Sequence, residues 1–181
     1  THADSRSDIG IARFIHYTDI AGLRATPQVV IPFGSVRNTQ IGDVHLNHAS
    51  GFADPIIASA FWLINQPEQG ASGRYLALTP FIYLPLGQYD KYDAVNLGEN
   101  RFKYDVQLAW VQPLYGKWGF EFYQDAIWYG DNDDAGSGNQ TLSQDTSYQT
   151  QVNLRYDLNA KQRFALGYAA NYGGEQFLDG V

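Results

Sequence analysis

The chain has 181 residues, 44% of them apolar, which fits one packed domain and excludes wholesale disorder. Its net charge of -7 argues against nucleic acid as a partner, because phosphate binding needs clustered Lys and Arg side chains. It has no cysteine, hence no disulfide framework and no thiolate metal site, and no apolar run long enough for a transmembrane helix.

Alternation of apolar and polar residues is the main structural signal, and no long helical stripe competes with it. The alternation predicts strands that have one wet face and one dry face. It is clearest in residues 101–114 and 148–158, whereas residues 25–33 and 52–64 are apolar on both faces and residues 9–17 give the weakest pattern. In chain order, the predicted strands are residues 9–17, 25–33, 52–64, 74–86, 101–114, 118–129, 148–158 and 163–172.

The connections between these strands alternate in length. Short turns at one end of a sheet and long loops at the other are typical of outer-membrane β-barrels. Most of the predicted strands are longer than the usual strand length of about five or six residues. Their length matches the roughly nine to eleven residues of a strand that crosses a bilayer at a tilt. The short connections are residues 19–24, 115–117 and 159–161, residues 65–73 are intermediate, and the long polar loops are residues 34–51, 88–100 and 130–144.

These features predict an all-β fold, a transmembrane antiparallel up-and-down β-barrel in a bacterial outer membrane. The turns also predict register. The turn after Leu114 places Gln107 opposite Asp125, and the last turn places Asn153 opposite Gly167. Large polar side chains would then lie beside small residues, which suits a barrel interior.

Alternation alone does not say which way the dry face points. A soluble lipocalin-like ligand-binding barrel would place it inside, whereas a membrane barrel places it against lipid. Aromatic residues near strand ends, such as Trp118, Trp128 and Tyr148, favour lipid, as does the scarcity of lysine. The wet face then lines the lumen, and the predicted lumen residues are Arg101, Lys103, Asp105, Gln107, Glu121, Tyr123, Asp125, Gln149, Gln151, Asn153 and Arg155.

The charges in this set have mixed sign. They either set the field of a pore or pair as salt bridges that hold the barrel interior together. A mixed lumen argues against strong selectivity for anions or cations. The predicted function is therefore a passive channel for small molecules, with the lipid bilayer and the permeant as its partners.

Five motifs stand out in the sequence, namely FADP at residues 52–55, TPFIYLPLGQYD at 79–90, NLGENR at 96–101, WYGDNDD at 128–134 and GGEQFLDGV at 173–181. Together they resemble the outer-membrane channel family labelled as the meta-pathway of phenol degradation. The resemblance implies a monomeric barrel of twelve strands that admits small, often aromatic, molecules, and it supplies no catalytic residues. About eight strands lie in this chain, so residues 1–181 are expected to be one β-barrel domain that is incomplete at both ends.

Metal and enzyme sites have weaker signals. Residues 131–134 offer oxygen ligands for calcium, but without EF-hand spacing a solvated loop is favoured. Glu121 and Asp125 lie roughly 13 Å apart along one strand, which is too far for a glycosidase pair. A barrel enzyme would depend on His16, whereas His45 and His48 are expected to be surface residues. We therefore expect no enzyme activity, no cofactor and no metal.

Overall fold

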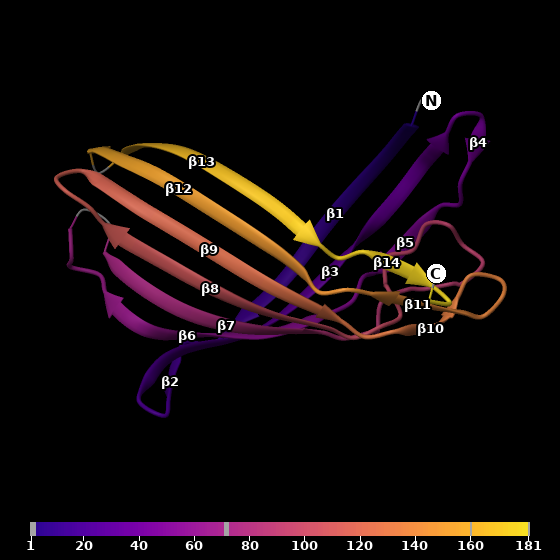
Figure 1. Ribbon diagram of the computed structural model, residues 1–181, viewed down its shortest axis with the longest axis horizontal. Coiled ribbons are helices and arrows are strands. Elements are labelled where there is room, and N and C mark those ends of the chain that lie inside the picture. The colour runs from indigo at the N-terminus through magenta and orange to yellow at the C-terminus, as the bar shows by residue number, and fades with distance from the viewer. Residues whose placement is uncertain (1–2, 71–72, 160, 181) are drawn as a thin grey trace.

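Eight long antiparallel strands form one curled sheet in the computed structural model, which describes residues 3–70, 73–159 and 161–180 (Figure 1). Residues 71–72, 160 and 181, which belong to two predicted connections and the last motif, lie outside the described residues. In sheet order the strands are β1 (Ala3–Ile15), β3 (Leu23–Ile41), β6 (Ile56–Gln66), β7 (Arg74–Tyr83), β8 (Lys103–Pro113), β9 (Trp118–Tyr129), β12 (Ser147–Asn159) and β13 (Gln162–Gly173). The predicted all-β antiparallel architecture is confirmed. No helix among the described residues is both long and apolar enough to span a membrane.

Six shorter strands lie beside this sheet. Three of them pair with β3, and the other three form a small separate sheet. Those that pair with β3 are β2 (Thr18–Ile20), β4 (Val44–His45) and β5 (Ala49–Phe52), and those of the small sheet are β10 (Asn132–Ala135), β11 (Gln140–Gln144) and β14 (Gln176–Leu178).

Two predicted loops, residues 34–51 and residues 130–144, therefore contain strand residues. The loop predicted at residues 34–51 is wrong over its first part, because β3 continues to Ile41 and pairs with β1 along that length. Of the predicted strand at residues 52–64, Phe52 lies in β5, residues 53–55 lie outside any strand, and the remainder lies in β6. Residues 34–41 carry polar side chains on both faces, so they lack the dry face by which the other strands are recognised.

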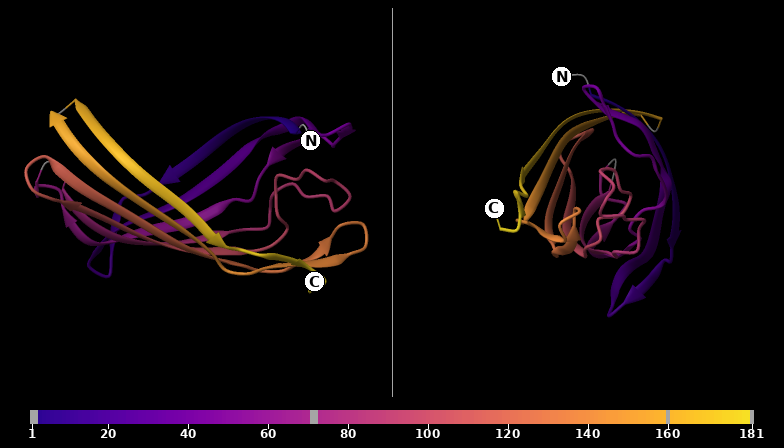
Figure 2. Two further views of the ribbon diagram at one scale, coloured as in Figure 1. Left: turned by 45° about the horizontal axis from the view of Figure 1, so that its top comes forward. Right: turned by 90° about the vertical axis from the view of Figure 1, so that its right-hand side faces the viewer.

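The short turns and the long loops lie at opposite ends of the sheet, as predicted. Both described ends of the chain lie at the loop end, where the small sheet is also found (Figure 1). Viewed end-on, the sheet curls into an arc, and the loop between β7 and β8 lies inside that arc (Figure 2, right). Within the described residues, β1 and β13 are the two edges of the sheet.

The predicted register is confirmed. Gln107 pairs with Asp125 between β8 and β9, and Asn153 pairs with Gly167 between β12 and β13. The last turn differs in detail, because the register shifts by one residue between Asp157 and Asn159.

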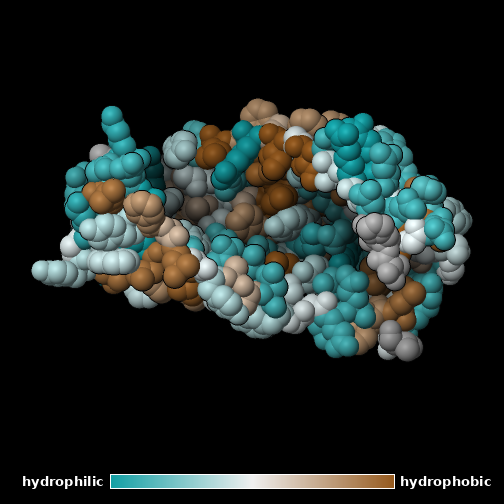
Figure 3. All heavy atoms as spheres, turned by 90° about the horizontal axis from the view of Figure 1, so that it is seen from above, coloured by the Kyte–Doolittle hydropathy of each residue, from teal (hydrophilic) through white to brown (hydrophobic). Residues whose placement is uncertain are grey.

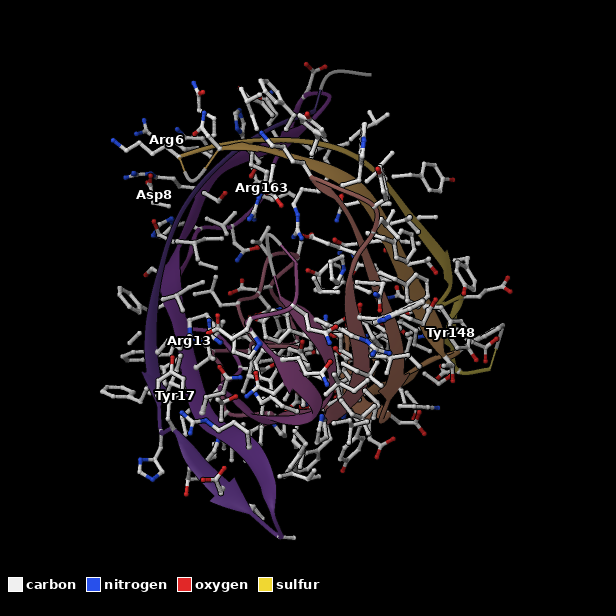
Figure 4. All side chains as sticks on the ribbon, turned by 90° about the vertical axis from the view of Figure 1, so that its left-hand side faces the viewer. Arg6, Asp8, Arg13, Tyr17, Tyr148 and Arg163 are labelled. Atoms are coloured by element: carbon white, nitrogen blue, oxygen red, sulfur yellow. The ribbon has the colours of Figure 1, made fainter. Side chains whose placement is uncertain are left out.

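The two faces of the sheet have opposite polarity. The only fully buried apolar residues among those described are alanines, so no large apolar core fills the arc. Tyr148 lies on the outer side of the arc and Arg163 on the inner side (Figure 4). The lipocalin-like alternative requires the reverse arrangement. Large side chains left exposed on the outer face include Phe14, Val29, Ile57, Leu78, Ile82, Tyr104, Trp110, Trp128 and Leu154.

Aromatic residues mark two levels on the outer face. Trp118 contacts Tyr156 at the turn end, and Tyr148 stacks on Tyr172 at the loop end. Trp118 and Trp128 stand near the two ends of β9. At about 3.3 Å per residue and a tilt of about 40°, their levels are roughly 25 Å apart, the height of the apolar band of a membrane barrel.

Candidate functional site: the hollow of the sheet and its mouth

The hollow inside the arc has a polar wall built by β8, β9 and β12. The strand pairing places all the predicted lumen residues of these strands on one face, and Arg101 lies just before β8. Figure 3 looks into the hollow and shows hydrophilic side chains over much of its surface. Because these side chains lie on neighbouring strands, they meet in three groups along the wall.

The group nearest the turn end is centred on Arg155, which is only 3% exposed. Its guanidinium forms a salt bridge with Glu121, and its Nε lies 3.4 Å from Asp157 Oδ2. Asp157 also pairs with Arg163 at 2.6 Å. A buried guanidinium needs such partners, since a lone charge in this position would be strongly destabilising.

The group nearest the loop end is centred on Glu99. Arg101 Nη2 donates to Glu99 Oε2 at 2.8 Å, and Lys103 forms a salt bridge with the other carboxylate oxygen. Burial alone would raise the pKa of Glu99, but the hydrogen bonds from Lys103 and Arg101 hold that pKa below its ordinary value. The two cations also lie over aromatic rings, Arg101 over Tyr129 and Lys103 over Tyr83.

The middle group contains two carboxylates. Asp125 Oδ1 accepts a hydrogen bond of 2.8 Å from Gln107 Nε2. Neither Asp105 nor Asp125 forms a salt bridge within the part of the chain that the structure describes. In the groups at the two ends of the polar wall, the cations form salt bridges with Glu99 and Glu121. The two acids of the middle group form no such salt bridge with a described residue.

The part of the hollow that adjoins the polar wall, on β1, β3, β6 and β7, is more apolar. A cavity of about 550 Å³ lies against β1, β3, β6, β7 and β8. The polar groups of this cavity include Arg13, whose Nε donates to Gln28 Oε1 at 2.7 Å. The lining side chains are Ile11, Arg13, Ile15, Tyr17, Thr26, Gln28, Val30, Ala60, Trp62, Ala77, Thr79, Phe81, Gln107 and Ala109.

A loop closes part of the mouth. Residues 84–102, between β7 and β8, are fastened by Asp54, which is 7% exposed. Asp54 Oδ1 accepts from the backbone N–H of Gly87 at 2.9 Å, and Oδ2 accepts from that of Glu99 at 2.8 Å. The backbone packs so closely that a Cβ at Gly87 would lie 2.6 Å from Asp54 N. One carboxylate thus holds both ends of the loop.

A second anchor comes from the small sheet. Asn132 of β10 is 2% exposed, and its Nδ2 donates to Tyr89 Oη at 3.0 Å and to Glu99 O at 3.2 Å. Its Oδ1 accepts from Asn100 Nδ2 at 2.9 Å. Asp54 and Asn132, together with the groups they bind, are called the mouth clamp below.

Comparisons with known proteins agree with this architecture. The family model described as "Putative MetA-pathway of phenol degradation" matches residues 2–180. The chain belongs to this family. It is also similar to the crystal structure of an outer membrane channel from Pseudomonas putida F1, with 36% sequence identity and a TM-score of 0.85 over 98% of this chain. The chain spans 65% of the length of that channel. No curated protein matches the chain.

Four of the five motifs that resemble the family contribute a residue to the mouth clamp. Asp54 belongs to FADP, Gly87 to TPFIYLPLGQYD, Glu99 to NLGENR and Asn132 to WYGDNDD. The sequence analysis did not identify Asp54 as a site residue and considered Asn132 only within the calcium candidate at residues 131–134, although the motifs contain both residues.

The histidine and calcium candidates take other roles. His16, His45 and His48 are exposed. Within residues 131–134, Asn132 is part of the clamp and Asp134 pairs with Lys91 at 2.8 Å. No group of three or more His, Cys, Asp or Glu side chains in the described ranges is placed to hold a metal ion.

Proposed function

We propose that this member of the family is a passive channel of the bacterial outer membrane, with the hollow of the curled sheet as its lumen. The observation that carries the proposal is the opposite polarity of the two faces. Exposed aromatic and aliphatic side chains on the outer face suit lipid, and charged side chains on the inner face suit water. Solutes would move down their gradient without chemistry, and the eleven predicted residues of the polar wall would line their path.

The permeants proposed are small molecules with an apolar or aromatic part. The support is the apolar wall beside the charged one, where Trp62, Phe81 and Val30 line the 550 Å³ cavity. These side chains would contact the apolar or aromatic part of a permeant. Arg13 and Gln28 would donate hydrogen bonds to a polar substituent of the same molecule. The family description, which refers to phenol degradation, agrees with this size and chemistry.

The complete channel is proposed to be a monomeric barrel of twelve strands. An open sheet edge cannot face lipid, because its backbone groups would have no hydrogen-bonding partner. β1 and β13 are such edges within the described residues. The share of the Pseudomonas channel that this chain spans, 65%, leaves room for further strands to close the barrel.

Single-channel recording in a planar bilayer tests the proposal. The refolded full-length protein is expected to give steady, small currents, since the mouth clamp narrows the lumen. Block of that current by phenol-sized solutes would then identify permeants. Absence of current from a protein that migrates as a folded barrel would contradict the channel.

A further inference from the structure

Two buried carboxylates in the middle group of the polar wall form no salt bridge with any residue that the structure describes. Asp105 is 6% exposed and Asp125 is 4% exposed. Asp105 Oδ1 and Asp125 Oδ2 are buried and accept no hydrogen bond from any described residue. Burying an ionised carboxylate is costly unless it is paired or binds a cation. The other acids of the wall, Glu99 and Glu121, both have cationic partners.

The strand register brings the two carboxylates together. Asp125 lies opposite Gln107, and Asp105 precedes Gln107 by two residues on the same face of β8. Residues in this diagonal relation have Cα atoms about 7–8 Å apart, so both side chains can reach a point between them. Gln107 donates to Asp125 through Nε2, which leaves its Oε1 as a third oxygen at this place. Thr79, which is also buried, pairs with Gln107 from β7.

We propose that Asp105, Asp125 and Gln107 form a binding site for a divalent cation of the Ca²⁺ type. All the donors are oxygen atoms, which hard cations prefer, and two carboxylates balance a charge of two. With only these protein ligands, water completes the coordination shell. The affinity is accordingly modest, about 10⁻⁴ to 10⁻³ M, as in extracellular calcium modules.

The site has a consequence for conduction, which rests on the proposed channel function. A divalent ion bound on the lumen wall, between the groups centred on Glu99 and on Arg155, replaces the negative potential there by a neutral or positive one. Monovalent cations would therefore pass more slowly when millimolar Ca²⁺ is present. An empty site would give the lumen a preference for cations.

Binding is tested first, without reference to conduction. Tb³⁺ is the probe, because it replaces Ca²⁺ at oxygen sites and emits when nearby Tyr or Trp side chains are excited. The refolded full-length protein in detergent should show one saturable site from which Ca²⁺ displaces Tb³⁺. Asp105→Asn and Asp125→Asn should each weaken Tb³⁺ binding by about ten-fold or more, since each removes one charge of two.

Asp43→Asn is the matched control, because Asp43 is an exposed acid in the turn between β3 and β4. It should bind Tb³⁺ as the unaltered protein does. Gln107→Ala, which keeps both charges, should weaken binding less, and it provides a second test if an aspartate variant does not fold. No saturable binding by the unaltered protein, or equal binding by the folded aspartate and control variants, would overturn the proposal.

Recordings in a bilayer separate this site from the channel proposal. Ca²⁺ should reduce the K⁺ current of the unaltered protein and of Asp43→Asn, but not that of Asp105→Asn. Tb³⁺ binding without current would support the site and refute the channel. Current without Tb³⁺ binding would support the channel and refute the site.

Discussion

Arg155 lies across Gly119 on the neighbouring strand, with its Nη2 only 2.6 Å from the position that a Cβ at Gly119 would occupy. Asn153 and Gly167 have the same relationship, since Asn153 Oδ1 lies 2.1 Å from the corresponding point. The small residues therefore make room for long polar side chains on the inner face. This packing lets Arg155 reach Glu121.

Gly119→Ala should displace Arg155 and weaken its salt bridge with Glu121. We expect a loss of about 1–3 kcal/mol of stability, because a buried charged hydrogen bond is disturbed. Thermal or urea unfolding of the detergent-solubilised barrel measures the change. Gly138→Ala is the control, since its Cβ would lie in ordinary contact with Gln140. Equal unfolding of the two variants would show that Arg155 adapts without cost.

Asp54→Ala should release the loop at the mouth. The variant loses two hydrogen bonds to a carboxylate, each worth about 1.5–3 kcal/mol. We expect faster protease cleavage within residues 84–102 and a larger, noisier current. Asp93→Ala changes an exposed acid of the same loop and should leave both readouts unaltered. A current identical to that of the unaltered protein would mean that the loop does not narrow the path.

The mouth clamp should open at acidic pH. The pKa of Glu99 is held below its ordinary value by Lys103 and Arg101, so the ionised form is favoured in the folded loop. That contribution is complete above the pKa of an unfolded glutamate, about 4.3, and is lost as the pH falls through the lower folded value.

Hydrogen exchange of the loop amides measures this pH dependence. Protection of residues 84–102 should persist at pH 5 and decrease below about pH 4. Glu99→Gln should lower the protection above about pH 4 to the level that the unaltered protein reaches in acid, and it should remove the acidic transition. If both proteins lose protection at the same pH, another carboxylate controls the loop.

The apolar side chains that line the 550 Å³ cavity should speed the uptake of apolar solutes but not that of polar ones. Trp62→Gln places a polar group in the cavity while β6 and its pairing remain. Uptake of a phenol-sized solute into proteoliposomes should slow several-fold, since the ring loses an apolar surface to contact. Uptake of glycerol is the internal control and should stay constant. Equal slowing of both solutes would indicate a general narrowing of the lumen.

The sequence was sufficient for the sheet but not for the clamp. Alternation and the tight turn after Leu114 predict the pairing of Gln107 with Asp125, because register follows from turn geometry once the faces are known. The clamp joins Asp54 to Glu99 across 45 residues, and no local pattern reports such a contact. The apolar wall was missed for a related reason: residues 25–33 and 52–64 are apolar on both faces, so no wet face marks the inner side.

Thiol block of single-channel current tests whether the inner face is the wall of a water-filled channel. The chain has no cysteine, so Gln151→Cys and the neighbouring Val152→Cys each carry one reactive group. These two residues point to opposite faces of β12. A charged thiol reagent should reduce the current of Gln151→Cys and leave that of Val152→Cys unchanged. Block of Val152→Cys with no effect on Gln151→Cys would show that the outer face, and not the inner face, lines the channel.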